Sequence, residues 1–208
     1  MGHSPSAPAG VRGVGAFEGR TIGWALSGSH HTLTGVLGVM RRMREEGANI
    51  LPVVSATLLQ TTTRHGTPED RWAEIVQAAG RPPLTTIPEV EPFGPERTLD
   101  ALVLAPCTGN SLAKLANAVT DTAPLMAAKA QLRNGRPVVV GISTNDALGL
   151  NAANLARLLV ARNVYFVPFG QDSPEHKPTS LVAHFELCPQ AVLAALEGRQ
   201  LQPLLQTW

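Results

Sequence analysis

The sequence is poor in cysteine, and this excludes two kinds of protein. Among 208 residues only Cys107 and Cys188 are cysteines, too few for a disulfide framework and not spaced as a pair of metal ligands. His65, His176 and His184 show no ligand spacing with a partner residue. We therefore expect no metal site, and the reduced thiols fit the cytoplasm better than an oxidising compartment.

Aromatic residues, long apolar runs and charge of one sign are also scarce. Aromatics make up 4% of the chain, and no apolar run approaches the roughly 18 residues of a membrane-spanning helix. The formal net charge is +1 without a basic run, which argues against binding to nucleic acid or to a membrane. Residues 1–20 lack the apolar segment of a signal peptide. We expect a flexible N-terminal tail over residues 1–20 and one domain over residues 21–208.

The remaining chain alternates between strand and helix patterns. Strands are predicted at residues 21–27, 50–54, 85–87, 101–105, 137–142 and 165–168, and helices at residues 33–46, 68–79, 112–119, 122–132, 151–162 and 189–196. Pro106 should end the fourth strand because proline has no N–H for the ladder. This alternation predicts an α/β fold with a parallel sheet and helices on both faces.

Polar turns follow four of the predicted strands. They are Ser27–His31, Ser55–Arg64, Pro106–Ser111 and Ser143–Asp146. Each turn alone could be an ordinary connection, but the carboxyl ends of parallel strands meet at one rim, where open α/β sheets bind ligands. Helix N-termini at such a rim favour anions. The convergence therefore predicts a ligand crevice.

The first polar turn bears on the kind of nucleotide. Gly28 and its neighbouring hydroxyls would accept a phosphate, whereas a dinucleotide fingerprint needs three glycines at fixed spacing, which are absent. A mononucleotide is favoured. His30 and His31 would touch the phosphate or be plain turn residues. Residues 169–178 form a long charged loop, a candidate lid.

Several of these motifs resemble the flavoprotein family that includes flavin-containing cysteine decarboxylases. The resemblance lies in Ser27-Gly28-Ser29, Pro106–Ser111 and Thr144-Asn145. Further segments resemble one branch of it, the B subunits of dipicolinate synthase. They are residues 63–64, 91–95, 105–110, 126–130, 132–134, 143–149 and 166–172. Together with the alternating pattern, this predicts a single Rossmann-like (flavodoxin-like) domain.

The resemblance implies FMN as cofactor and assigns residues to it. Gly28, Ser29 and Ser55 would hold the phosphate. The other residues implied in cofactor binding are Ser27, Pro106, Thr108, Gly109, Asn110, Ser111, Ser143 and Thr144. Asn110 and Asn145 would serve catalysis, together with Arg64, whose guanidinium would clamp a substrate carboxylate or form a surface ion pair.

The resemblance also implies an activity and partners. The substrate would be a small dicarboxylate, a dihydro- or hydroxytetrahydrodipicolinate, which is oxidised to dipicolinic acid in the mother cell of a sporulating bacterium. The A subunit of dipicolinate synthase would be the partner and would supply an NADP site. The chain itself would assemble into trimers or larger homo-oligomers.

Three residues and one departure leave alternatives open. Cys107 is expected to pack rather than react, while Lys129 and Arg133 would lie on a solvated helix face or at an oligomer contact. The decarboxylase branch places a catalytic histidine shortly before the middle strand, but residues 79–100 contain none. This argues against a stand-alone decarboxylase, and a non-catalytic scaffold for the A subunit stays open as a second alternative.

Overall fold

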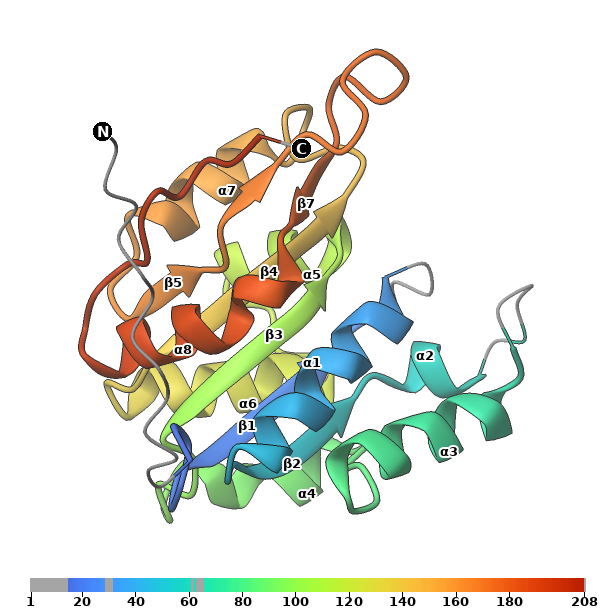
Figure 1. Ribbon diagram of the computed structural model, residues 1–208, viewed down its shortest axis with the longest axis vertical. Coiled ribbons are helices and arrows are strands. Elements are labelled where there is room, and N and C mark those ends of the chain that lie inside the picture. Colours follow the sequence, from blue (N-terminus) through green and yellow to red (C-terminus); the bar gives the residue numbers. More distant parts are fainter. Residues whose placement is uncertain (1–14, 29–31, 61, 63–65, 208) are drawn as a thin grey trace, which may run out of the picture.

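One mixed sheet organises the part of the chain that the structure, a computed structural model, describes: residues 15–28, 32–60, 62 and 66–207. The strands are β1 (Thr21–Leu26), β2 (Asn49–Val54), β3 (Ala101–Cys107), β4 (Val138–Thr144), β5 (Val164–Phe166), β6 (Phe169–Gly170) and β7 (Leu181–Ala183). The order is β2-β1-β3-β4-β7-β6, and β5 also pairs with β4 (Figure 1).

The pairing is parallel from β2 to β5 and antiparallel beyond it. β1 to β5 form the predicted parallel arrangement, while β7 runs antiparallel to both β4 and β6. β6 and β7 have two and three residues, so neither is long enough to show an alternating pattern in the sequence. The α/β fold is therefore confirmed, with a short antiparallel edge that the sequence pattern does not reveal.

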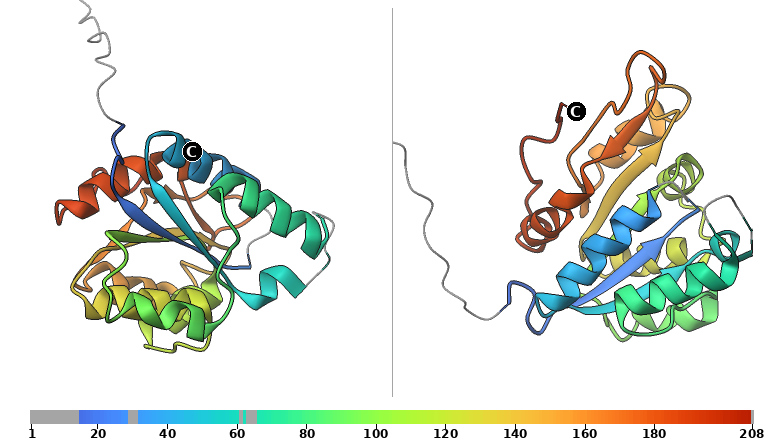
Figure 2. Two further views of the ribbon diagram at one scale, coloured as in Figure 1. Left: turned by 90° about the horizontal axis from the view of Figure 1, so that it is seen from below. Right: turned by 45° about the vertical axis from the view of Figure 1, so that its right-hand side comes forward.

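Helices cover both faces of the sheet. They are α1 (Leu33–Glu45), α2 (Ala56–Gln60), α3 (Pro68–Ala79), α4 (Ile87–Val90), α5 (Gly109–Ala116), α6 (Ala123–Arg133), α7 (Ala152–Leu159) and α8 (Cys188–Leu196). Short 3-10 turns occupy Glu91–Phe93 and Phe185–Leu187. α1 and α8 pack on one face and α4 and α6 on the other (Figure 2). No described helix is both long and apolar enough to span a membrane.

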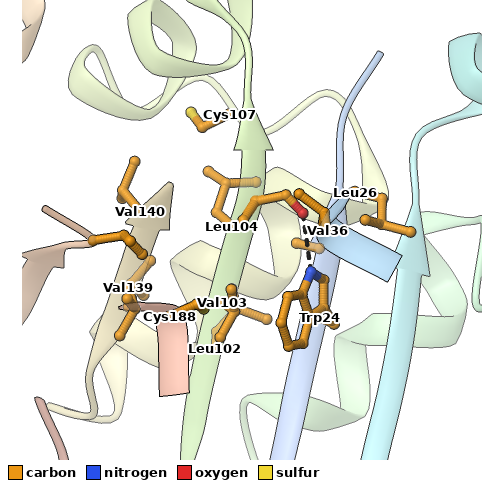
Figure 3. Close-up of a cluster of buried hydrophobic side chains, with 14 of the residues drawn as sticks. Trp24, Leu26, Val36, Leu102, Val103, Leu104, Cys107, Val139, Val140 and Cys188 are labelled. Carbon is orange, nitrogen blue, oxygen red and sulfur yellow. Dashed lines mark hydrogen bonds between the residues drawn. The ribbon is translucent and has the colours of Figure 1, made fainter. Parts of the chain in front are cut away.

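The middle strand β3 departs from the prediction at Pro106. The strand runs on to Cys107 through a cis Ala105–Pro106 bond. Its pairing with β4 shifts register between Leu104 and Cys107, so Pro106 has no partner in the ladder and its missing N–H is tolerated. Every residue of β3 is buried. Figure 3 shows this strand between Trp24 and Leu26 of β1 and the valines Val139 and Val140 of β4.

The predicted strand at residues 85–87 is wrong. Leu84 makes only a single parallel bridge to Val53, and α4 begins at Ile87. The carboxylate of Glu89 accepts hydrogen bonds from the backbone N–H groups of Thr85 and Thr86 at 2.9 and 2.8 Å. Such side-chain capping stabilises a helix start, and it outweighs the strand propensity of the two threonines.

Packing begins earlier than residue 21. Phe17, in the segment expected as a tail, is fully buried, and its N–H donates to the Glu46 carbonyl oxygen at 3.2 Å. An aromatic ring gains more from burial than the small residues around it, so residues 15–20 fold against the end of α1.

Candidate functional site

A pocket of about 240 Å³ opens where β1, β2 and β3 end. Six residues predicted from the polar turns line it: Ser27, Gly28, Ser55, Thr108, Asn110 and Ser111. They come from three turns that are far apart in the sequence, and the parallel strands bring them together as expected. Two further predicted residues, Ser29 and Arg64, lie outside the described part of the chain, as do His30, His31 and His65.

Two hydroxyl groups hold the turns of the pocket in place. The Ser27 hydroxyl donates to the Pro106 carbonyl oxygen at 2.7 Å and accepts from the Thr108 N–H at 3.2 Å. Thr108 is the N-cap of α5, and its Oγ1 accepts from the Ser111 N–H at 3.4 Å. Ser27 and Pro106 therefore shape the pocket, and Pro106 does so through its backbone rather than by lining it.

The hydroxyl of Ser55 is the exception. Ser55 is 7% exposed, and its Oγ is buried without a hydrogen-bond partner among the described residues. Leaving such a group unpaired costs about 1–3 kcal/mol. Ser55 lines the pocket together with Asn110 and Ser111 near the N-terminus of α5, where a helix favours negative charge. The donor set therefore fits the phosphate end of a flavin mononucleotide.

Residues at the end of β4 and in the turn after it lie beside the pocket rather than in its lining. The hydroxyl oxygens of Ser143 and Thr32 are 3.4 Å apart, and Thr144 Oγ1 donates to Asp146 Oδ1 at 2.5 Å. The exposed Asn145 offers its carbonyl oxygen to the Thr179 hydroxyl at 2.6 Å. Of the candidate lid predicted at residues 169–178, Phe169 and Gly170 form β6 and the rest lies in the loop that follows β6. The bond from Thr179 ties the end of this loop to the turn after β4.

Gly109 lies where α5 meets the turn after β4. A Cβ atom at this glycine would stand 2.6 Å from Thr144 Oγ1, 2.6 Å from Asp146 Oδ1 and 2.9 Å from Asn151 Nδ2. Asn151 in turn donates to Asp146 Oδ2 at 2.7 Å. Only a residue without a side chain fits this contact, so Gly109 joins the two turns without lining the pocket.

The prediction from the sequence missed part of the lining. Thr57, Lys114, Thr122, Pro124 and Leu125 also line the pocket. Lys114 follows Ser111 by one helical turn and so shares its face of α5. Its ammonium group lies 2.7 Å from Asp121 Oδ2 and, through this hydrogen bond, lowers the pKa of the Asp121 carboxyl. The helical spacing from Ser111 was the signal that would have identified Lys114.

Cys107 packs in the core, as expected. It is fully buried at the end of β3 (Figure 3), and burial raises the pKa of its thiol to about 12. Cys188 on α8 is likewise buried, with its pKa raised to about 12. Neither thiol is available as a nucleophile at neutral pH.

Both cysteines should therefore be inert in the folded protein. We expect Ellman's reagent at pH 8 to label neither thiol over the time in which it labels both in guanidinium, because burial raises the pKa of both thiols and encloses their sulfur atoms. Fast reaction of one equivalent without denaturant would contradict the packing role of Cys107 or Cys188. Absorbance at the thionitrobenzoate band measures the result.

In the described ranges, no cluster of three or more histidine, cysteine or acidic side chains is arranged to hold a metal ion. The polar groups of the site are hydroxyls, amides and one lysine. Such a set binds an anionic, hydrogen-bonding ligand rather than a cation.

Comparison with known proteins identifies the family. A family model described as Flavoprotein matches residues 15–178. The chain belongs to the flavoprotein family. It is 48% identical over 192 residues to the B subunit of dipicolinate synthase from Bacillus subtilis (strain 168), and the match covers 92% of this chain and 96% of the relative. The resemblance inferred from the motifs is thus confirmed.

Solved structures agree with this assignment. The crystal structure of the dipicolinate synthase B subunit from Bacillus halodurans C superposes with a TM-score of 0.85 at 51% identity, covering 92% of this chain and 98% of that chain. The FMN-dependent cysteine decarboxylase SpaF gives a TM-score of 0.61 at 18% identity, covering 88% and 99%. At that identity, SpaF shows a shared fold.

Proposed function

We propose that this chain is a flavin-binding subunit of a dipicolinate synthase. It would contribute to the oxidation of a dihydro- or hydroxytetrahydrodipicolinate to dipicolinic acid, with FMN in the pocket that Ser55 lines. The unpaired, buried Ser55 hydroxyl carries the proposal, because it is a donor that the protein itself leaves without an acceptor among its described residues. The two relatives that are 48% and 51% identical are named as B subunits of dipicolinate synthase, which supports dipicolinic acid as the product.

The residues of the pocket have distinct proposed roles. Ser55 and Gly28, with Ser29, would hold the phosphate, while Thr108, Asn110 and Ser111 would bind the rest of the cofactor by hydrogen bonds. A bound flavin supplies a hydride acceptor. Lys114 would place its ammonium group beside the phosphate while it keeps its hydrogen bond to Asp121.

The turn after β4 would face the substrate. Asn145 would reach the substrate, Ser143 and Thr144 would support the flavin from this side, and Arg64 would clamp a carboxylate through its planar guanidinium. The bonds from Thr144 to Asp146 and from Thr179 to Asn145 hold this turn in one position, which keeps the polar groups oriented before ligand arrives.

The assembly is proposed from the relatives. The name of the Bacillus subtilis protein, a B subunit, implies a second kind of subunit, so we propose that the A subunit supplies an NADP site and that the complex works in the mother cell during sporulation. One related Escherichia coli decarboxylase is described as dodecameric. This supports a homo-oligomer of three or more copies here.

Titration with FMN and with riboflavin tests the cofactor. We expect the wild type to bind FMN, with an absorption band near roughly 450 nm, and to bind riboflavin more weakly because riboflavin lacks the phosphate. Ser55→Ala should weaken FMN binding by about tenfold, the worth of one charge-assisted hydrogen bond, and leave riboflavin binding unchanged. If Ser55→Ala weakens the binding of FMN and of riboflavin equally, Ser55 does not contact the phosphate.

Activity of the two subunits, first separate and then mixed, tests the reaction. We expect dipicolinate to form only when the two subunits are mixed. The rate of its formation should fall when Ser55 is replaced by alanine. The chain would be a scaffold instead if it takes up no FMN and if the isolated A subunit forms dipicolinate as fast as the complex of both subunits. Carbon dioxide release from a cysteine-type substrate by this chain alone would show a decarboxylase.

A further inference from the structure

A second cavity lies directly beside the flavin pocket. It is a groove of about 390 Å³ between α6 and the segment that follows α5. Leu125 lines both the groove and the pocket, so the two are neighbours across one side chain. The lining of the groove is mostly aliphatic and includes two cationic residues. The residues that matter are Leu115, Val119, Leu125, Lys129, Leu132 and Arg133.

The spacing of residues along α6 explains why the cations gather there. Leu125, Lys129, Leu132 and Arg133 follow one another at intervals of four, three and one residues, which keeps them on one face of a helix. The opposite face, with Ala127 and its alanine neighbours, packs on the sheet. Lys129 and Arg133 therefore project from the same stripe that presents the leucines to the groove.

The two cations are not neutralised by the described part of the protein. Neither Lys129 nor Arg133 forms an ion pair with a described residue, and no described residue that lines the groove is acidic. Lys114 in the pocket, by contrast, is paired with Asp121 at 2.7 Å. Arg133 in the last turn is favoured by the helix dipole, but Lys129 four residues before it adds a like charge that repels it.

An apolar lining with two unpaired cations matches one ligand chemistry. A small, flat ring carrying two carboxylates buries its faces against leucine and valine and offers one anion to each cation. A binding site for a neutral or basic ligand would not carry two adjacent positive charges. The bound dianion also removes the repulsion between Lys129 and Arg133.

We propose that this groove is the subsite for the dicarboxylate, with Lys129 and Arg133 as the residues that select two carboxylates over one. The substrate class rests on the proposed function, whereas the location and the two residues come from the groove itself. Lys129 and Arg133 are then binding residues rather than members of a solvated helix face or an oligomer contact.

Binding of dipicolinate to the full chain, measured by calorimetry at low ionic strength, tests this subsite. Picolinate, with one carboxylate, is the comparison ligand. Lys129→Met and Arg133→Met should each weaken dipicolinate binding by about tenfold, because each removes one charge-assisted contact, and the double variant should bind the two ligands alike. Arg162→Met removes an exposed cation between α7 and β5 and should leave dipicolinate binding unchanged.

Other outcomes overturn the subsite. The subsite is wrong if the wild type does not bind dipicolinate, or if the wild type and the double variant bind dipicolinate with equal affinity. A change in the mass of the oligomer with unchanged dipicolinate affinity would show an interface between copies instead. FMN titration separates the two proposals: if FMN does not bind while dipicolinate binding still depends on Lys129 and Arg133, the subsite stands and the flavin proposal fails.

Discussion

Trp24→Ala is expected to remove a large share of the stability of the fold. Trp24 is 1% exposed in β1, an interior strand of the sheet, and truncating a buried tryptophan costs about 3–5 kcal/mol. Its indole N–H donates to the Ala105 carbonyl oxygen at 2.9 Å (Figure 3), and the lost bond leaves a buried acceptor unpaired. Since domains of this size are stable by about 5–15 kcal/mol, the urea midpoint should fall steeply.

Two further variants separate burial from hydrogen bonding. Trp72→Ala makes the same chemical change on α3 at a side chain that is 40% exposed, and should cost below about 1 kcal/mol. Trp24→Phe keeps most of the apolar surface but loses the donor to Ala105, and should cost about 1–3 kcal/mol. Circular dichroism should follow unfolding, because fluorescence changes with the tryptophans. Equal losses for Trp24→Ala and Trp72→Ala would show that the indole of Trp24 is not a core anchor.

The order of the main elements could be predicted because each has a pattern of its own. A buried strand such as Val138–Ile142 can be predicted from the length of its apolar run and its β-branched residues. The start of α3 is predicted by Thr67, Pro68 and Asp70, and the structure contains the capping box that Thr67 and Asp70 form. β6 and β7 have no such pattern. They exist because the end of β4 offers free backbone groups to Leu181 and Val182, a tertiary effect that no local signal reports.

The candidate site likewise has features that the sequence predicts and features that only tertiary packing determines. The polar turns after the strands can be predicted from the sequence, since the direction of parallel strands alone brings Ser27, Ser55 and Thr108 to one rim. The sequence predicts that Pro106 ends the strand, which is wrong because the register shift that lets β3 continue to Cys107 depends on the pairing of β3 with β4. The sequence does not predict that Thr122 lines the pocket, because Thr122 is the N-cap of α6 and the position of α6 relative to α5 is set by packing rather than by either helix alone.

Gly109→Ala is expected to damage flavin binding more than any other one-carbon change in the site. The new methyl group would stand 2.6 Å from both Thr144 Oγ1 and Asp146 Oδ1. These are ends of short side chains that are bonded to each other and to Asn151, so they cannot swing aside without breaking that network. Overpacking of this kind costs about 1–3 kcal/mol, so the turn after β4 must move away from α5, and FMN affinity should fall by about tenfold or more.

Gly38→Ala is the matched control, because a Cβ there meets nothing within 4 Å. Gly38 lies inside α1, where alanine is favoured over glycine by about 0.5–1 kcal/mol, so this variant should be slightly more stable and bind FMN normally. The unfolding free energy of Gly109→Ala, measured beside its FMN titration, shows whether the variant is folded. Unchanged FMN affinity in a folded Gly109→Ala protein would mean that the contact between α5 and the turn after β4 does not shape the pocket. Thr144→Ala removes one of the two crowded oxygens. If Gly109→Ala weakens FMN binding less in the Thr144→Ala protein than in the wild type, the effect is located at that contact.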